Sequence, residues 1–201
     1  MMRTKPAQRL WMSLLSLAFV AGIGLVAASS AQACLIDSDG IEDCSFSLRK
    51  AEIRDRVTPN TDIWNADGEM NTLPSATMPD DIAENGVGVA FGYVDSAGSS
   101  FVQVDEITFA SSDCKASGSR YPRVRCKNDS GLFRLSPRSA LSFFQVVVRA
   151  GKREITPALS IANTPLAVVI NTPDSLHRGD SVDPCKYTAA RDVKLTCKRL
   201  P

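Results

Sequence analysis

The sequence has few of the residues on which enzymes most often rely. Only 6% of its residues are aromatic, and one of its 201 residues is a histidine. That histidine, His177, lies in the polar stretch Ser175–Asp180. Gly-x-Ser-x-Gly, His-Glu-x-x-His, Walker and dinucleotide-binding motifs are absent. These absences argue against the common hydrolases and nucleotide-dependent enzymes, and we expect a non-enzymatic protein that requires no cofactor.

Cys-x-x-Cys spacing is also absent, although the chain contains six cysteines. Dithiol redox sites and structural zinc sites usually need that spacing, so we expect the cysteines to be structural. They fall into three close couples, Cys34 with Cys44, Cys114 with Cys126, and Cys185 with Cys197. Pairing within each couple is the simplest connectivity. It predicts three local disulfides, the last two tying β-hairpins.

The first 33 residues contain no acidic residue. A basic lead, Met1–Arg9, precedes the apolar run Leu10–Val26 and the small-residue site Ala31–Ala33. This order is typical of a secretory signal peptide that is cleaved before Cys34. The apolar run is shorter than the roughly 20 residues of a membrane-spanning helix. We therefore predict a secreted or periplasmic protein with no membrane span after residues 1–33 are removed.

Alternating apolar and polar residues dominate the chain after Cys44. No later segment sustains the apolar spacing of a three-turn helix. The alternation and the turn residues between segments predict eight strands: Phe46–Arg54, Val87–Val94, Phe101–Phe109, Arg120–Lys127, Leu132–Leu135, Leu141–Ala150, Leu166–Ile170 and Val193–Lys198. Short strands at this spacing indicate an all-β, antiparallel β-sandwich over residues 46–201, immunoglobulin-like or jelly-roll-like. The polar segment Asn65–Glu84 is interpreted as a long surface excursion.

A faint internal repeat runs through this region. The couple Cys114 and Cys126, each followed by lysine, is echoed by the couple Cys185 and Cys197, each also followed by lysine. Upstream, Val89–Asp95 is echoed by Val168–Asp174. The repeat predicts a sandwich of two similar halves. We expect the two copies to face each other across one core.

An acidic loop, residues 34–45, is bracketed by Cys34 and Cys44. Within it the run from Asp37 to Asp43 reads Asp-Ser-Asp-Gly-Ile-Glu-Asp. This run resembles the short calcium loops of thrombospondin type 3 and related repeats. The resemblance implies Asp37, Asp39 and Asp43 as Ca²⁺ ligands, since carboxylates at alternate positions can converge on a hard cation. An acidic hairpin tip with an Asp-Gly turn is the alternative interpretation.

Charge is unevenly distributed along the chain. Residues 34–114 carry a net charge of −12, residues 115–153 carry +9, and residues 154–201 carry +1. Alternation places Arg123, Arg125 and Lys127 on the face opposite Val124 and Cys126. In the companion hairpin it places Lys194 and Lys198 on the corresponding face. These five cations are the candidate ligand-binding residues.

Such a basic stripe suits an acidic partner. We expect a protein of the cell envelope or exterior that binds an anionic polysaccharide, a lipid head group or another protein through this surface, whereas nucleic acid is not an expected partner. The basic and acidic segments can instead neutralise each other within the fold. Two further hypotheses are a carbohydrate-active hydrolase, with two carboxylates beside Trp64 or Tyr93, and a self-assembling envelope subunit whose copies dock acidic to basic end.

Overall fold

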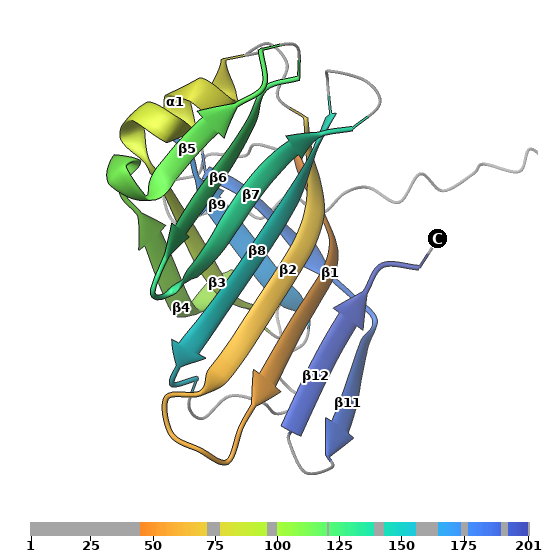
Figure 1. Ribbon diagram of the computed structural model, residues 1–201. Helices are drawn as coiled ribbons and strands as arrows, with labels where there is room; N and C mark the ends of the chain where they lie inside the picture. The colour runs from red at the N-terminus through yellow and green to blue at the C-terminus, as the bar shows by residue number, and fades with distance from the viewer. Residues whose placement is uncertain are drawn as a thin grey trace, which may run out of the picture. The chain divides into compact units, whose positions relative to one another are not determined.

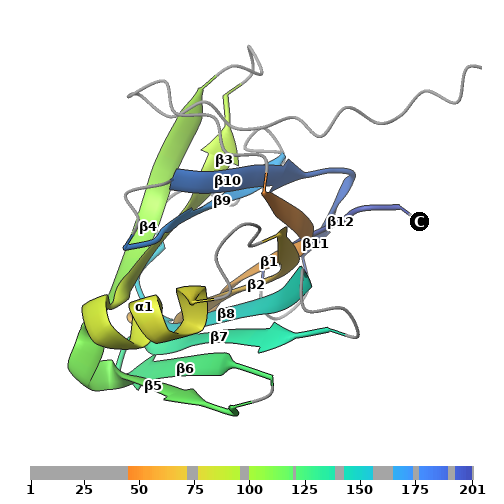
Figure 2. The ribbon, with the colours of Figure 1, turned by 90° about the horizontal axis from the view of Figure 1, so that it is seen from above.

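The strands of the protein form two antiparallel sheets that pack together (Figures 1 and 2). Burial alternates along the strands, as expected when one face of each sheet is packed against the other sheet. The computed structural model describes residues 45–71, 77–95, 100–119, 121–138, 143–155, 165–173, 177–189 and 193–200. All of them belong to one compact unit, Gln32–Pro201. The predicted all-β, antiparallel sandwich is therefore confirmed. No helix in the described ranges is long and apolar enough to cross a membrane.

The larger sheet has eight strands among the described residues, and the smaller has four. From edge to edge the larger sheet comprises β11 (Cys185–Ala189), β12 (Val193–Lys198), β1 (Phe46–Asp55), β2 (Asp62–Asn71), β8 (Phe143–Arg153), β7 (Gly131–Pro137), β6 (Arg123–Asn128) and β5 (Cys114–Ser117). The smaller comprises β10 (His177–Val182), β9 (Leu166–Asn171), β3 (Val87–Val94) and β4 (Phe101–Phe109). A short helix, α1 (Met78–Asn85), packs against β5 and β6.

The core lies between the two sheets and is filled by alternate residues of their strands. Trp64 of β2 is fully buried and stacks on Phe91 of β3, with ring centroids 4.6 Å apart. Its indole N–H donates to Asp105 of β4 over 2.6 Å. Asp105 also holds Arg153, the last residue of β8. Trp64 thus joins both sheets. Its apolar ring is buried against β3, and its one donor is satisfied by β4.

The prediction that Asn65–Glu84 is a surface excursion is wrong for most of its described residues. Asn65–Asn71 continue β2, which lies at the centre of the larger sheet, and Met78–Asn85 form α1. Gly68 suggested a turn in the sequence. In the fold, a Cβ at Gly68 would lie 2.7 Å from the Phe46 ring. Glycine is therefore present because an aromatic ring packs against the strand there.

The described part of the polar stretch around His177 belongs to a strand, β10, which the sequence did not predict and which pairs with β9 throughout its length. Asp180 is only 1% exposed and accepts hydrogen bonds from the Leu48 N–H at 2.8 Å and from Arg199 at 2.7 Å. Burial raises the pKa of Asp180 despite these donors. The polar residues misled the prediction because here they are buried and hydrogen-bonded.

The two halves of the strand sequence have the same arrangement. Strands β1 to β6 correspond in order to β7 to β12, and every strand pairing in one half has its counterpart in the other. Both sheets are symmetric about their midpoints, which lie between β2 and β8 and between β3 and β9. If the two disulfides are equivalent, the pseudo-twofold axis of the larger sheet passes through the Ala66–Val148 pair, which shares their cross-strand row. In the smaller sheet the echo of Val89 in Val168 makes the paired residues Ala90 and Val169 equivalent. The predicted duplication is present, with β3 matched to β9 as the sequence echo indicated.

The predicted placement of the two copies needs correction. The disulfide-tied hairpins do not face each other across the core but form the opposite edges of the larger sheet (Figure 1). Both disulfides belong to one cross-strand row on the inner face. Across the sheet this row reads Cys185, Cys197, Ala51, Ala66, Val148, Phe133, Cys126 and Cys114.

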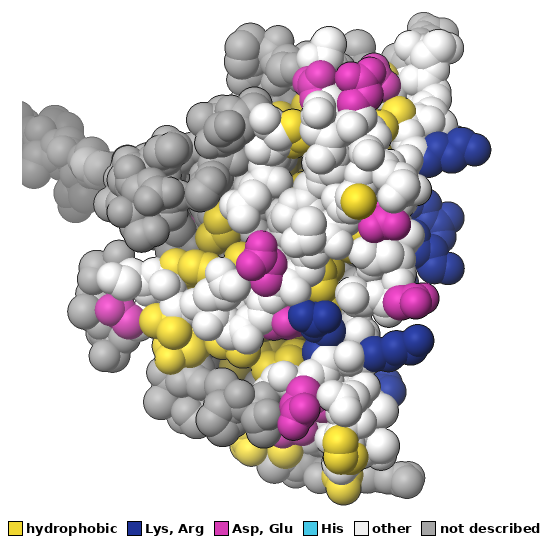
Figure 3. All heavy atoms as spheres, turned by 90° about the vertical axis from the view of Figure 1, so that its left-hand side faces the viewer, with side chains coloured by type: hydrophobic (Ala, Val, Ile, Leu, Met, Phe, Trp, Pro, Cys, Tyr) yellow, Lys and Arg dark blue, Asp and Glu magenta, His cyan; other side chains and the backbone are white. Residues whose placement is uncertain are grey.

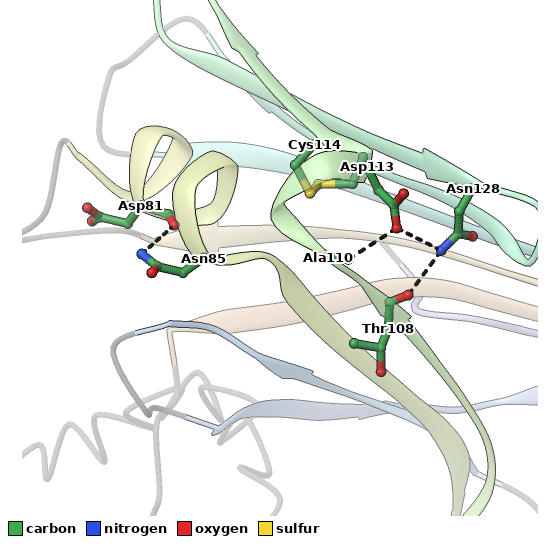
Figure 4. Close-up of a disulfide and its surroundings, with 8 residues drawn as sticks. Asp81, Asn85, Thr108, Ala110, Asp113, Cys114 and Asn128 are labelled. Atoms are coloured by element: carbon green, nitrogen blue, oxygen red, sulfur yellow. Dashed lines mark hydrogen bonds between the residues drawn. A yellow bond between two sulfur atoms is a disulfide. The ribbon is translucent and has the colours of Figure 1, made fainter.

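The predicted disulfides Cys114–Cys126 and Cys185–Cys197 are both present. Figure 4 shows the first beside α1 and the turn before β5, where the Asp113 carboxylate accepts from the Ala110 N–H at 3.1 Å. Asn128 donates to the same carboxylate at 3.2 Å. This edge is therefore anchored by a helix and a hydrogen-bonded turn. Cys34 and Cys44 lie outside the described residues, so their pairing stays a prediction.

We expect the two disulfides to protect their hairpins unequally. Each closes a loop of similar length, so Cys185→Ser/Cys197→Ser and Cys114→Ser/Cys126→Ser should each lower the free energy of unfolding by about 2–3 kcal/mol. Only the loss of the Cys185–Cys197 disulfide should let its hairpin open locally. The reason is that β11 pairs with β12 alone, whereas α1 packs against β5 and β6. Denaturant titration and amide hydrogen exchange measure these effects. Earlier exchange in β5–β6 would contradict the expectation.

Candidate anion-binding face

Six exposed cations lie on the outer face of strands β5 to β8. They are Lys115, Arg123, Arg125, Lys127, Arg134 and Arg149. Figure 3 shows Lys and Arg side chains aligned along the side of the molecule that is this outer face. Among the residues that the structure describes, none of the six forms an ion pair. We call these six residues the basic face.

The register brings three cations of the basic face side by side. Lys115 lies opposite Arg125, and Arg125 lies opposite Arg134. Neighbouring strands are roughly 5 Å apart, so this row places three positive charges close together. Like charges in directly opposed positions destabilise a sheet. An anion bound beside this row would therefore reduce the repulsion among its three positive charges.

The same cations line a shallow depression of about 610 Å³ on the sheet. Arg123, Arg149, the row, Val147 and Leu132 are among the residues that line it, and none of the lining residues is acidic. Val147 faces outward here and is half-buried. Its outward position follows from the two-residue period of β8.

Two serines hold arginine side chains of the depression in position. The Arg123 Nε donates to Ser117 Oγ over 3.0 Å, and the Arg134 Nε donates to Ser136 Oγ over 2.8 Å. Both bonds use the Nε–H and leave the terminal nitrogens of each guanidinium for other acceptors. A neutral partner orients the fork without cancelling its charge, so both arginines are prepared for an external anion.

The five predicted binding cations do not form one site. Arg123, Arg125 and Lys127 lie together on β6 within the basic face. Lys194 and Lys198 lie on β12, in the other half of the sheet, and Lys194 Nζ is 3.1 Å from Glu52. Sequence reasoning omitted Lys115, Arg134 and Arg149. The strand order brings these three beside β6, although outward alternation with apolar neighbours was a usable signal for Arg134.

Glu52 is the centre of an ion cluster in that other half. It is 5% exposed and is contacted by Lys50 at 3.2 Å, Arg54 at 3.0 Å and Lys194 at 3.1 Å. Burial by itself raises the pKa of Glu52, but the three cations outweigh it and bring that pKa below its ordinary value of 4.5. Lys194 thus has an internal partner, which weakens its case as a ligand-binding residue.

The other candidate features have different outcomes. Trp64 is fully buried and offers no platform for a sugar ring, which removes one element of the hydrolase hypothesis. Asp37, Asp39 and Asp43 lie outside the described residues, so the calcium site stays a prediction. Within the described ranges no group of three or more His, Cys, Asp or Glu side chains could hold a metal ion.

The Glu52 cluster makes stability depend on pH in a defined direction. Because the fold lowers the pKa of Glu52, its stabilisation is present above the unfolded value and is lost as pH falls through the lower, folded value. Glu52→Gln should lower the free energy of unfolding at pH 7 by about 1 kcal/mol, since the partner cations are partly in water. The deficit should shrink below about pH 4. Urea titrations across pH 3–7 measure it, and a constant deficit contradicts the assignment.

Comparison with family models, with curated protein sequences and with solved structures found no match for this chain.

Proposed function

We propose that this protein is an exported, non-enzymatic β-sandwich that binds an acidic partner through the basic face. The observation that carries the proposal is the concentration of six exposed cations, without an ion pair among the described residues, on one side of four adjacent strands. An export route rests on the composition of residues 1–33. An anionic polysaccharide, a lipid head group or an acidic protein surface would suit this charge.

Internal neutralisation is the competing account of the charge pattern, and it operates elsewhere in the sheet. Glu52 neutralises Lys194, and Glu69 forms ion pairs with Arg49 at 2.7 Å and Arg138 at 2.8 Å. Arg153 is paired with Asp105. These ion pairs neutralise part of the charge of the acidic and basic segments. None of them includes a residue of the basic face, which favours binding there.

The proposal predicts retention on a heparin column at low salt. Arg123→Ser/Arg125→Ser/Lys127→Ser should elute at clearly lower salt than the unaltered protein, because each lost contact reduces the salt-dependent part of binding. Elution position across a salt gradient is the measurement, and circular dichroism verifies that the sheets remain.

The matched control is Arg56→Ser/Lys152→Ser/Lys186→Ser, which removes the same charge from exposed residues outside the basic face. It should elute close to the unaltered protein. Absence of retention at low salt would overturn the proposal. Equal losses in the two triple variants would mean that net charge alone, rather than the basic face, causes retention.

A further inference from the structure

The pseudo-twofold axis provides an internal comparison for the basic face. Ala66 and Val148 pair on the axis, so the residues that follow them, Asp67 and Arg149, occupy equivalent positions. Ala51 and Phe133 are equivalent because each lies between a disulfide cysteine and the axial pair. The residues that follow these, Glu52 and Arg134, are therefore equivalent as well. At both positions an acid in one half is replaced by arginine in the other.

Other positions keep their positive charge in both halves. Lys115 follows Cys114 as Lys186 follows Cys185, and Arg123 corresponds to Lys194 in the matching hairpins. In the half that contains Glu52, the carboxylate contacts Lys194 directly. In the basic half, the equivalent Arg123 has Arg134 in place of that carboxylate. Of the three cations that contact Glu52, only Lys194 has a cationic counterpart, because Lys50 and Arg54 correspond to Leu132 and Ser136. The internal anion itself is exchanged for another cation.

The sheet itself does not require this reversal. The same backbone arrangement accommodates Glu52 and Asp67 in the other half, where Glu52 is 5% exposed and paired. The cost of opposed like charges in the Lys115–Arg125–Arg134 row is avoidable, because an acid at position 134 would relieve it. An anion from outside the chain relieves it equally, and binding of such an anion would explain why the avoidable arrangement is present.

We propose that the depression lined by Lys115, Arg123, Arg125, Arg134 and Arg149 binds a phosphate or sulfate ester group of the ligand. This inference rests on the proposed function and deepens it. A carboxylate offers two oxygens and one charge, which a single guanidinium fork satisfies. A phosphate or sulfate ester offers three terminal oxygens, and a phosphate monoester carries close to two charges. Forks from adjacent strands match that larger acceptor set better than they match a lone carboxylate.

Exchanging residues between the halves tests the site. Arg134→Glu/Arg149→Asp introduces the residues that the other half already carries at these positions. The variant should fold with an unchanged or higher melting temperature and should lose at least ten-fold in affinity for dextran sulfate. The control Arg56→Glu/Lys186→Asp makes the same charge change outside the basic face and should lose little. Affinity of the exchanged variant equal to that of the control would overturn the site.

A charge-conserving variant separates this inference from general polyanion binding. Arg125→Lys/Arg134→Lys keeps every charge but removes the guanidinium forks, and its affinity for dextran sulfate should fall about five-fold or more. The unaltered protein should bind dextran sulfate or dextran phosphate more tightly than polyglutamate of matched charge, and the tighter binder of the first two identifies the ester. If the protein binds all three polymers equally and the Arg125→Lys/Arg134→Lys variant binds them as well as the unaltered protein does, the ester site is overturned but the proposed function still stands. Binding to none of them would overturn both.

Discussion

The alignment of eight strands in one register is the constraint on which the rest of the molecule depends. One inner row crosses the whole larger sheet and ends in a disulfide at each edge. Because side chains alternate with a period of two, burying this row forces the neighbouring residues of each strand to the outer face. The positions of Arg125 and Arg134 in water therefore follow from the burial of Cys126 and Phe133. Core packing and surface charge are two results of the same register.

Duplication gives this register a second consequence. Two equivalent halves of the sheet carry different charge patterns on the same backbone frame, one organised around a buried acid and the other without any acid in its depression. Such a difference cannot be attributed to the fold, because the fold is common to both halves. Charge at Glu52 stabilises the sandwich, whereas charge at Arg134 lies opposite a like charge. One half therefore contains the ion cluster around Glu52, and the proposed binding lies on the other.

Sequence patterns anticipated the elements whose side chains alternate regularly. Val87–Val94 and Phe101–Phe109 are strands with the expected bounds, since their apolar residues and flanking turns agree. The sequence prediction missed β2 and β10, each because of a different kind of residue. In β2 a glycine at the sheet centre accommodates Phe46, and in β10 the polar residues Arg178 and Asp180 are buried. Both depend on contacts between residues far apart in the chain, which a local pattern does not record.

The sequence by itself determined the class of fold, the local pairing of two cysteine couples, and the outward direction of the cations on β6. Each of these follows from alternation or from loop length, which are properties of neighbouring residues. Only the tertiary structure decided which cations gather. It placed Lys115, Arg134 and Arg149 beside β6 and paired Lys194 with Glu52. It also set the two disulfide-tied hairpins at opposite edges of one sheet. Strand order is established by the packing of segments distant in sequence, so charge that is dispersed along the chain becomes a face only after folding.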